Sequence, residues 1–508
     1  MPNRKRESKV QIWISGAVEM KKRWRIGKLL VINMLLVAAV VCFLYDSVTA
    51  HVGHKKKATG LVIDTVTLEP ISNALIYQNG TEIFTDEKGH FPVTKLQPDL
   101  PIHVRASGYM RKTIYLKHTR VPISLDPFEA RGLYLSFYGL GTRSVRESVL
   151  SVINQTDLNA VVIDIKGDRG YICYDNHMKK AREIGALRMP MVQDMSRLIS
   201  DLHQRGIYVI GRIVVFRDDL LARYHPEFAV RCLDPGSLYV DYQGLAWTDP
   251  FNDKVRAYNI EIARRVAEAG IDEIQFDYIR FPDAPDRSQL LFSKPLLEKT
   301  RVEAINTFLA DARHVLAPFN TFISADVYGY TLWNKNDTLI GQKIEEMAPH
   351  LDYICPMVYP SSFQHGLPGY RNSVAHPKEI VLLTLKNGNE RLAGLRVQMR
   401  PWLQNFRDYA FDRRMFGAKG VALQIAGAEM AGSCGWLLWD PRNVYQGVAD
   451  LERTNPQVDL CALLQMSTKG VYPDQRQEMW YPDRRTKIWE RNWFTKHFII
   501  SDVVKELF

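Results

Sequence analysis

Two strand-like runs of the chain carry aspartates near their ends, and paired carboxyl groups can do acid–base chemistry. Asp277 lies in the run 272–279, and Asp326 lies in the run 322–328. Neighbouring strands are roughly 5 Å apart, so carboxyl groups that end consecutive strands should be close together. Two like charges at such a range do not both ionise cheaply, and the pKa of one group rises. An acid paired with a carboxylate nucleophile or base is what cleavage of a glycosidic bond requires.

Strand alternation selects which side chains share a face with these aspartates. Glu273, Gln275 and Asp277 alternate with apolar residues, and so do Ser324, Asp326 and Tyr328. The same reasoning applied to the other runs and the segments that follow them predicts substrate-binding side chains at one end of the fold. These are Asp164, Lys166, Arg212, Tyr278, Arg280, Tyr328, Tyr359, Arg400, Trp402 and Trp439. The aromatic members offer rings on which apolar sugar faces could stack.

Structural roles compete with these chemical ones. Asp277 could instead form a salt bridge with Arg280 or Arg212, and Asp326 could pair with Lys166 or Arg400. A nucleophilic Schiff-base role for Lys166 is disfavoured because a neighbouring carboxylate would keep the amine protonated. The thirteen histidines are scattered along the chain, so the pattern predicts no metal site and no cofactor.

The elements that must position these residues form a second pattern. From 131 to 451, eight strand-like runs alternate with helical runs, which fits a (β/α)8 barrel within the α/β class. A doubly wound open sheet is the alternative, but no G-x-G-x-x-G turn follows the first strand. The expected strands are 132–138, 159–166, 207–215, 272–279, 322–328, 351–358, 396–402 and 435–439. The expected helices are 144–154, 191–204, 254–269, 297–316, 337–347, 377–392 and 406–416.

The amino terminus has the composition of a membrane anchor. Residues 29–45 are uncharged, and 17 residues at about 1.5 Å each span about 26 Å as a helix. The basic segment 1–28 before them predicts a cytoplasmic amino terminus and exported downstream domains, in a single-pass membrane protein. A cleaved signal peptide is the alternative. The formal net charge of +10 is concentrated in residues 1–30, which hold nine basic and two acidic residues, so we expect no nucleic-acid partner.

Three further segments complete the organisation of the chain. Residues 46–57 form a linker, and 58–127 contain short alternating runs separated by turn signals, which predict a small β-sandwich. The motifs at 60–64, 70–74, 85–91 and 106–109 resemble those of carboxypeptidase regulatory-like domains. This resemblance implies a spacer or binding module without catalytic residues. Residues 452–508 are a polar and aromatic tail.

Five ordered motifs of the predicted barrel resemble a family of glycoside-hydrolase-like barrels that is distantly similar to α-amylase-like glycosidases. They are NAVVIDIK (159–166), GRIVVF (211–216), EIQFDYIRFP (273–282), ADVYGYT (325–331) and CPMVYP (355–360). The resemblance implies that Asp277 is the nucleophile. Amylase-type barrels carry a glutamate as the acid on strand five, where this chain has Asp326. Their third carboxylate, on strand seven, has no counterpart here, because Arg400 and Trp402 occupy that position.

The hypothesis that follows is a membrane-anchored envelope protein that cleaves or remodels a polysaccharide, with Asp277 as nucleophile or ion-pair stabiliser and Asp326 as proton donor. The alternative is a glycan-binding or scaffold barrel without turnover, which the absent strand-seven carboxylate favours. A metal-dependent polysaccharide deacetylase is a third and weaker alternative, since it needs a cluster of histidines and carboxylates.

Overall fold

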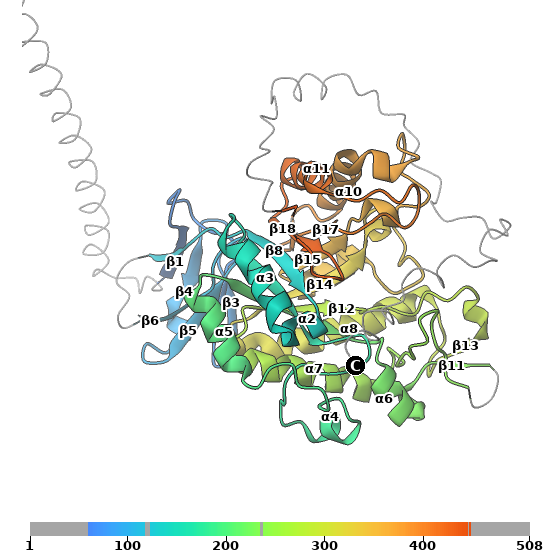
Figure 1. Ribbon diagram of the computed structural model, residues 1–508. Coiled ribbons are helices and arrows are strands. Elements are labelled where there is room, and N and C mark those ends of the chain that lie inside the picture. Colours follow the sequence, from blue (N-terminus) through green and yellow to red (C-terminus); the bar gives the residue numbers. More distant parts are fainter. Residues whose placement is uncertain (1–58, 117–121, 234–236, 446, 449–508) are drawn as a thin grey trace, which may run out of the picture. The chain divides into compact units, whose positions relative to one another are not determined.

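The computed structural model describes residues 59–116, 122–233, 237–445 and 447–448 (Figure 1). The predicted anchor at 29–45 and the tail at 452–508 lie outside these ranges. Within them, no helix combines the length and the apolar character that a membrane span needs.

Two small sheets precede the barrel. One has the strand order β4 (His90–Pro92), β1 (Thr59–Asp64), β7 (Ile123–Leu125), and the other is antiparallel with the order β3 (Thr81–Phe84), β2 (Leu75–Gln78), β5 (Pro101–Arg105), β6 (Lys112–Tyr115). Asn79 and Gly80, both with positive φ, make the two-residue turn between β2 and β3. The β character expected for 58–127 is confirmed, and the resemblance to a carboxypeptidase regulatory-like domain stays a prediction.

The rest of the described chain is a closed barrel of eight parallel strand positions, as the sequence predicts. Going round the barrel, these are β8 (Ala130–Leu135), β9 (Ala160–Lys166), β10 (Tyr208–Val214), β12 (Glu273–Asp277), β14 (Phe322–Tyr328), β15 (Tyr353–Met357), the pair β16 (Gln398–Met399) and β17 (Trp402–Gln404), and β18 (Gly435–Trp439). The pairing of β18 with β8 closes the ring. Gly435 is required at this seam, because a Cβ there would lie 2.1 Å from the carbonyl oxygen of Ala130.

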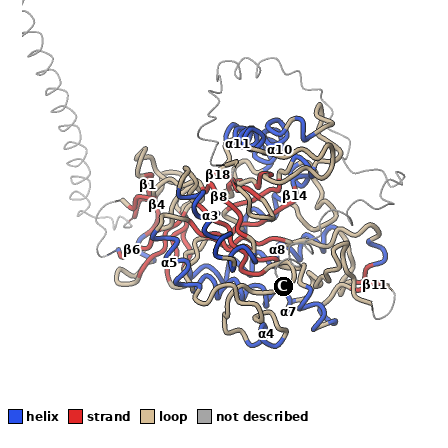
Figure 2. Tube along the Cα trace, viewed as in Figure 1, coloured by secondary structure: helices blue, strands red, loops and turns tan. Residues whose placement is uncertain are grey.

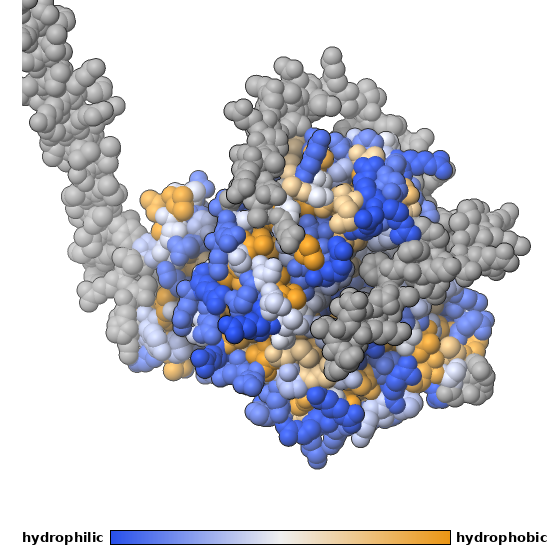
Figure 3. Space-filling model, in the orientation of Figure 1, coloured by the Kyte–Doolittle hydropathy of each residue, from blue (hydrophilic) through white to orange (hydrophobic). Residues whose placement is uncertain are grey.

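Helices follow most strands and pack on the outside of the barrel (Figure 2). Nine are α2 (Phe137–Gly141), α3 (Arg143–Asn154), α4 (Lys179–Glu183), α5 (Met195–Gln204), α6 (Asp219–Tyr224), α7 (Asp253–Glu268), α8 (Glu298–Leu316), α10 (Pro377–Arg391) and α11 (Ala418–Met430). The start of α7 is set by Asn252, whose side chain accepts hydrogen bonds from two amides of the first turn. The lysine- and arginine-rich α4 lies in a hydrophilic part of the surface (Figure 3).

Two helix predictions are wrong. The expected helix 337–347 is reduced to α9 (Ile344–Met347), and 406–416 contains no helix. In the latter segment the carboxylate of Asp408 accepts hydrogen bonds from the backbone amides of Ala410, Phe411, Asp412 and Arg413. An aspartate that binds nearby amides offers the backbone an alternative to a helix. The chain therefore forms a tight loop, and the helix begins only at Ala418.

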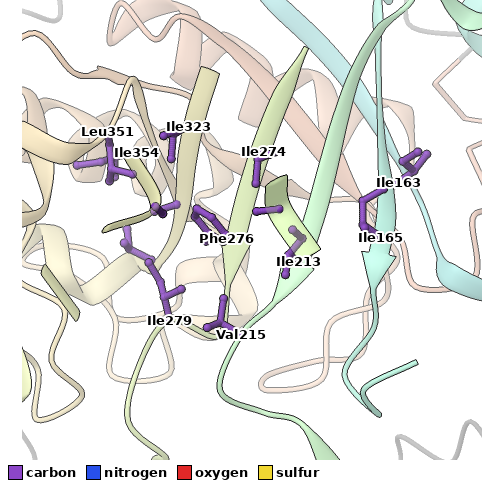
Figure 4. Packing of buried hydrophobic residues seen from close by; sticks show 14 of the residues in the cluster. Ile163, Ile165, Ile213, Val215, Ile274, Phe276, Ile279, Ile323, Leu351 and Ile354 are labelled. Atoms are coloured by element: carbon purple, nitrogen blue, oxygen red, sulfur yellow. The ribbon is translucent and has the colours of Figure 1, made fainter. Parts of the chain in front are cut away.

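Each barrel strand has an apolar face toward the helices and a more polar face toward the axis. Ile163, Ile213, Ile274, Phe276 and Ile323 belong to the outer cluster, where they pack between strands and helices (Figure 4). Asp164, Arg212, Asp277 and Asp326 occupy the alternate positions of the same strands. This alternation confirms the predicted axial face of β9, β10, β12 and β14, except at one position.

That exception is Lys166, which the sequence places on the axial face. The pairing of β9 with β10 slips by one residue, so that Ile213 lies opposite Lys166 instead of Ile165. A bulge of this kind reverses the direction of the side chains that follow it. Lys166 consequently points to the helix layer, where its Nζ lies 2.6 Å from Asp218 and 5.6 Å from the ring centroid of Tyr258 in α7. Both members of this ion pair are fully buried.

We predict that Asp218→Asn lowers the free energy of unfolding by about 3–5 kcal/mol, because it leaves the buried Lys166 ammonium without its counter-charge. The matched control is Glu183→Gln, which removes a largely exposed contact to Lys179 and should cost less than about 1 kcal/mol. Chemical denaturation of the two variants measures both values. Equal stabilities would contradict the structural role of Lys166.

Candidate active site at the carboxyl ends of the strands

A single guanidinium joins three neighbouring strands at the carboxyl end of the barrel. Arg212 on β10 donates from Nη1 to Asp164 Oδ1 on β9, at 2.6 Å. Its Nε and Nη2 donate to Asp277 Oδ2 on β12, at 2.9 and 2.6 Å. Arg212 and Asp164 are direct partners in the parallel register. All three side chains are buried, so the ion pairs are little screened by solvent.

Asp164 is fully engaged by the protein. Besides Arg212 it accepts a hydrogen bond from the Tyr134 hydroxyl at 2.6 Å and from the Phe137 amide at 3.1 Å. Burial raises the pKa of Asp164, and Arg212 and Tyr134 act in the opposite direction. Its hydrogen bonds thus fix the position of Asp164, which in turn orients Arg212.

Asp277 has donors on both carboxylate oxygens as well. Oδ2 faces Arg212, and Oδ1 accepts from the amide of Tyr278 at 2.6 Å. Tyr278 has φ of +50°, a left-handed conformation that costs a non-glycine residue about 1–3 kcal/mol. These donors hold both oxygens of Asp277 in place. The salt bridge to Arg212, which the sequence analysis gave as a structural role for Asp277, is therefore present in the structure. Asp277 nevertheless lies at the carboxyl end of β12, where the sequence predicted it.

Asp326 on β14 has a different environment. Its Oδ1 accepts from the indole Nε1 of Trp402 at 2.7 Å, and Oδ2 has no hydrogen-bond donor among the described residues. Neither Lys166 nor Arg400, the structural partners considered from sequence, contacts Asp326. Burial and the charge of Asp277 raise the pKa of Asp326 well above its ordinary value, and Arg212 and Trp402 offset this only in part. Asp326 is thus suited to hold a proton at neutral pH.

Aromatic rings surround the three aspartates. Trp439 stacks on Tyr134 with 3.8 Å between ring centroids and meets Trp402 edge-on at 5.4 Å. The Arg212 guanidinium lies 5.0 Å from the centroid of Trp439. Trp439 and Tyr359 are partly exposed, and burial and the charges of Asp326 and Asp277 raise the pKa of the Tyr359 hydroxyl. These two rings offer solvent-facing aromatic surface beside the carboxyl groups.

The remaining predicted rim residues form a second group. The guanidinium of Arg280 lies among three rings, with its Cζ 4.8 Å from the centroid of Trp247, 5.0 Å from that of Tyr278 and 4.7 Å from that of Tyr328. Tyr278 also accepts a hydrogen bond from Arg217 at 3.1 Å. Tyr278, Arg280 and Tyr328 are thus brought together near the ends of β12 and β14.

Two predicted site residues are elsewhere. Lys166 faces the helix layer, as described above. Arg400 lies at the opposite end of the barrel, where its Nη1 is 2.7 Å from Glu273, the first residue of β12, and its Cζ is 3.7 Å from the ring centroid of Tyr353. Asp277 lies four positions further along the strand than Glu273, which corresponds to about 13 Å. Arg400 therefore lines the lower interior of the barrel and does not contact the aspartate site.

Tyr134 and Arg217 were not among the predicted residues. Tyr134 could have been predicted, because alternation in the first strand places it on the axial face with Gly132. Arg217 lies in the segment after β10, where no periodic pattern indicates the direction of a side chain. No group of three or more histidine, cysteine or acidic side chains capable of holding a metal ion occurs among the described residues.

A family model described as "Putative glycosyl hydrolase domain" (DUF4015) matches residues 132–445. The chain belongs to this family. The match runs from the first barrel strand, β8, to beyond the last, β18, and so contains every residue of the aspartate site. No curated protein matches the chain.

Three solved structures illustrate what this family member is similar to. A hypothetical protein from Ruminiclostridium thermocellum is 39% identical, with 38% of this chain and 97% of that chain covered and a TM-score of 0.34. The PgaB (BpsB) glycoside hydrolase domain from Bordetella bronchiseptica is 15% identical, with 66% and 98% covered and a TM-score of 0.45. The spore cortex-lytic enzyme SleL from Bacillus megaterium is 11% identical, with 68% and 77% covered and a TM-score of 0.38.

The raised pKa of Asp326 predicts a pH dependence of stability. A carboxyl group that binds its proton more tightly in the folded state stabilises the fold below its unfolded pKa, near 3.9, and this stabilisation is lost as the pH rises through the folded pKa. We therefore expect the Tm of the wild type to fall relative to that of Asp326→Asn as the pH rises from about 4. Thermal unfolding of both proteins over a pH series measures the difference. Asp201→Asn, an exposed change on α5, should show no such trend.

Proposed function

We propose that the barrel hydrolyses or remodels a glycosidic bond in an extracytoplasmic polysaccharide. The observation that supports this proposal is that two aspartates on adjacent strands have different hydrogen-bonding environments. Asp277 is surrounded by donors, and Asp326 is buried beside that charge with one oxygen free of protein donors. Environments that separate the pKa values of two carboxyl groups are the usual way to assign an acid and a base.

In this mechanism Asp326 donates its proton to the glycosidic oxygen. The Oδ2 atom is available for this step, since Oδ1 is held by Trp402. Departure of the leaving group develops positive charge on the sugar, and the Asp277 carboxylate either attacks the anomeric carbon or stabilises that charge. Arg212 positions Asp277, and its contact with Asp164 in turn fixes Arg212.

The distance between the reacting carboxyl groups in the working complex determines the stereochemical course. A separation of about 5–5.5 Å favours retention through a covalent intermediate, and about 6.5–9.5 Å favours inversion. The aspartate on β14 is one methylene shorter than the glutamate of amylase-type barrels, which sets the donor further back. Trp439 and Tyr359 would stack on the sugar rings that flank the cleaved bond.

The proposal includes the location of the protein. The uncharged segment 29–45 with its basic flank supports an anchor in the cytoplasmic membrane, with the barrel on the extracytoplasmic side. A polysaccharide of the cell envelope would then be within reach of the site.

The roles of the two aspartates predict different kinetics. With a natural glycan, Asp326→Asn should lower kcat/KM by about 10²–10⁴-fold, because general-acid assistance is lost. With an aryl glycoside whose leaving group needs no proton, the same variant should lose far less. Asp277→Asn should lose comparable activity on both substrates, since it removes stabilisation of the sugar cation itself. Steady-state assays after a glycan panel has identified a substrate measure these values.

Asp201→Asn serves as the control and should retain full activity on both substrates. The alternative function, a glycan-binding barrel without turnover, makes the opposite prediction. In that case no member of the panel is hydrolysed, and Asp277→Asn changes glycan affinity only. The absence of a strand-seven carboxylate favours this alternative, because Trp402–Gln404 provides none.

A further inference from the structure

Arg280 is a second buried cation close to the aspartates in the chain. It follows Asp277 by three residues, and its side chain is nine-tenths buried, with 8% exposed. Three aromatic rings lie within about 5 Å of its Cζ, as described above. The guanidinium is therefore held in one place by Trp247, Tyr278 and Tyr328.

Other buried arginines of the barrel have carboxylate partners. Arg212 contacts two aspartates, Arg217 contacts Asp168 and Asp241, and Arg301 and Arg400 contact one carboxylate each. Arg280 differs, since no carboxylate of the described residues lies within salt-bridge distance of it. Its hydrogen bond is from Nη1 to the carbonyl oxygen of Phe281. The two acidic residues nearest along the chain, Asp277 and Asp283, pair with Arg212 and Arg287 instead.

A buried charge without a counter-ion is unfavourable unless something compensates it. Aromatic faces attract a cation, and a guanidinium is weakly hydrated, so the three rings partly compensate the burial of this charge. The hydrogen bond from Arg280 to Phe281 uses Nη1, and Nε and Nη2 have no acceptor among the described residues. A rigid cation with donors not used by the protein is a preorganised anion site.

We propose that Arg280 binds a carboxylate on the sugar substrate, so that the polysaccharide is an acidic one built from or decorated with uronic acids. This inference rests on the proposed function and names its substrate class. Tyr328 stands two residues beyond Asp326 on the same strand face, which is about 7 Å. A carboxylate bound to Arg280 would therefore belong to a sugar at or next to the cleaved bond. The planar fork of the guanidinium matches the two oxygens of a carboxylate.

The test measures ligand binding to a variant that lacks the proposed acid, so that hydrolysis of the ligand does not affect the measured affinity. The full-length protein carrying Asp326→Asn is titrated with oligosaccharides of polyglucuronate, polygalacturonate and polymannuronate. Each is compared with its carboxyl-reduced form, which has the same linkage without the charge. A sulfated sample of each reduced oligosaccharide separates a carboxylate from other anions. We expect at least one uronate to bind about 10–100-fold more tightly than its reduced form. This is the difference in affinity that a charge-assisted hydrogen bond typically makes.

Variants of Arg280 locate the effect. Arg280→Gln should remove the preference for the uronate and weaken binding of the reduced oligosaccharide much less. Arg280→Lys should keep only part of the preference, because the planar fork is lost. Arg182→Gln, which removes an exposed positive charge on α4, should keep the full preference. The comparison of charged and reduced ligands on the Asp326→Asn protein needs no Arg280 variant, so it remains valid even if Arg280→Gln does not fold.

Three results would overturn the proposal: equal binding of uronate and reduced forms, tighter binding of the sulfated form, or an unchanged preference in a folded Arg280→Gln. Failure of the proposed function would look different. In that case the uronate preference is observed, but the protein with Asp326 restored does not hydrolyse the bound oligosaccharide.

Discussion

The ion pair of Arg212 with two aspartates is the interaction on which the carboxyl end of the barrel depends. One buried guanidinium faces Asp164 and Asp277, and Asp326 stands on the next strand without a cation of its own. Three carboxyl groups around one buried cation cannot all ionise cheaply. Burial and the neighbouring charge of Asp277 raise the pKa of Asp326, whose side-chain donor is an indole N–H and not a guanidinium. The division into an acid and a carboxylate thus follows from the balance of charges.

The two ends of the barrel interior differ in how their charged side chains are paired. At the lower end, one guanidinium meets one carboxylate, Arg400 with Glu273, and the charges match. At the upper end Asp326 keeps one oxygen without a protein donor, and Arg280 lacks a carboxylate partner among the described residues. An unpaired charge costs stability, and proteins keep one mainly where a ligand supplies the missing partner. Hydrogen bonding alone does not separate the two ends, because Glu273 Oε1 and Arg400 Nη2 at the lower end also lack a partner among the described residues.

Much of the fold could be predicted because the strands and long helices carry strong periodic patterns. All eight strand positions and the helices near 144–154, 254–269, 297–316 and 377–392 follow from them. The helix expected at 406–416 does not form, because the Asp408 side chain binds four amides that a helix would need. The seventh strand is interrupted at Pro401, which has no amide hydrogen to donate. Such local competition between side chain and backbone is not visible in hydrophobic periodicity.

For the site, the sequence by itself determined which faces of β9, β10, β12 and β14 are polar, and therefore that Asp164, Arg212, Asp277 and Asp326 share the barrel axis. Only the tertiary structure decided which of the charged side chains form ion pairs with one another. A one-residue slip in the pairing of β9 with β10 turned Lys166 toward the helix layer. The position of Arg400 along its strand placed it at the end of the barrel opposite to the aspartate site. The physical reason is that alternation is a local property of each strand. Register, bulges and the partners of a charge are set by contacts between strands far apart in the chain.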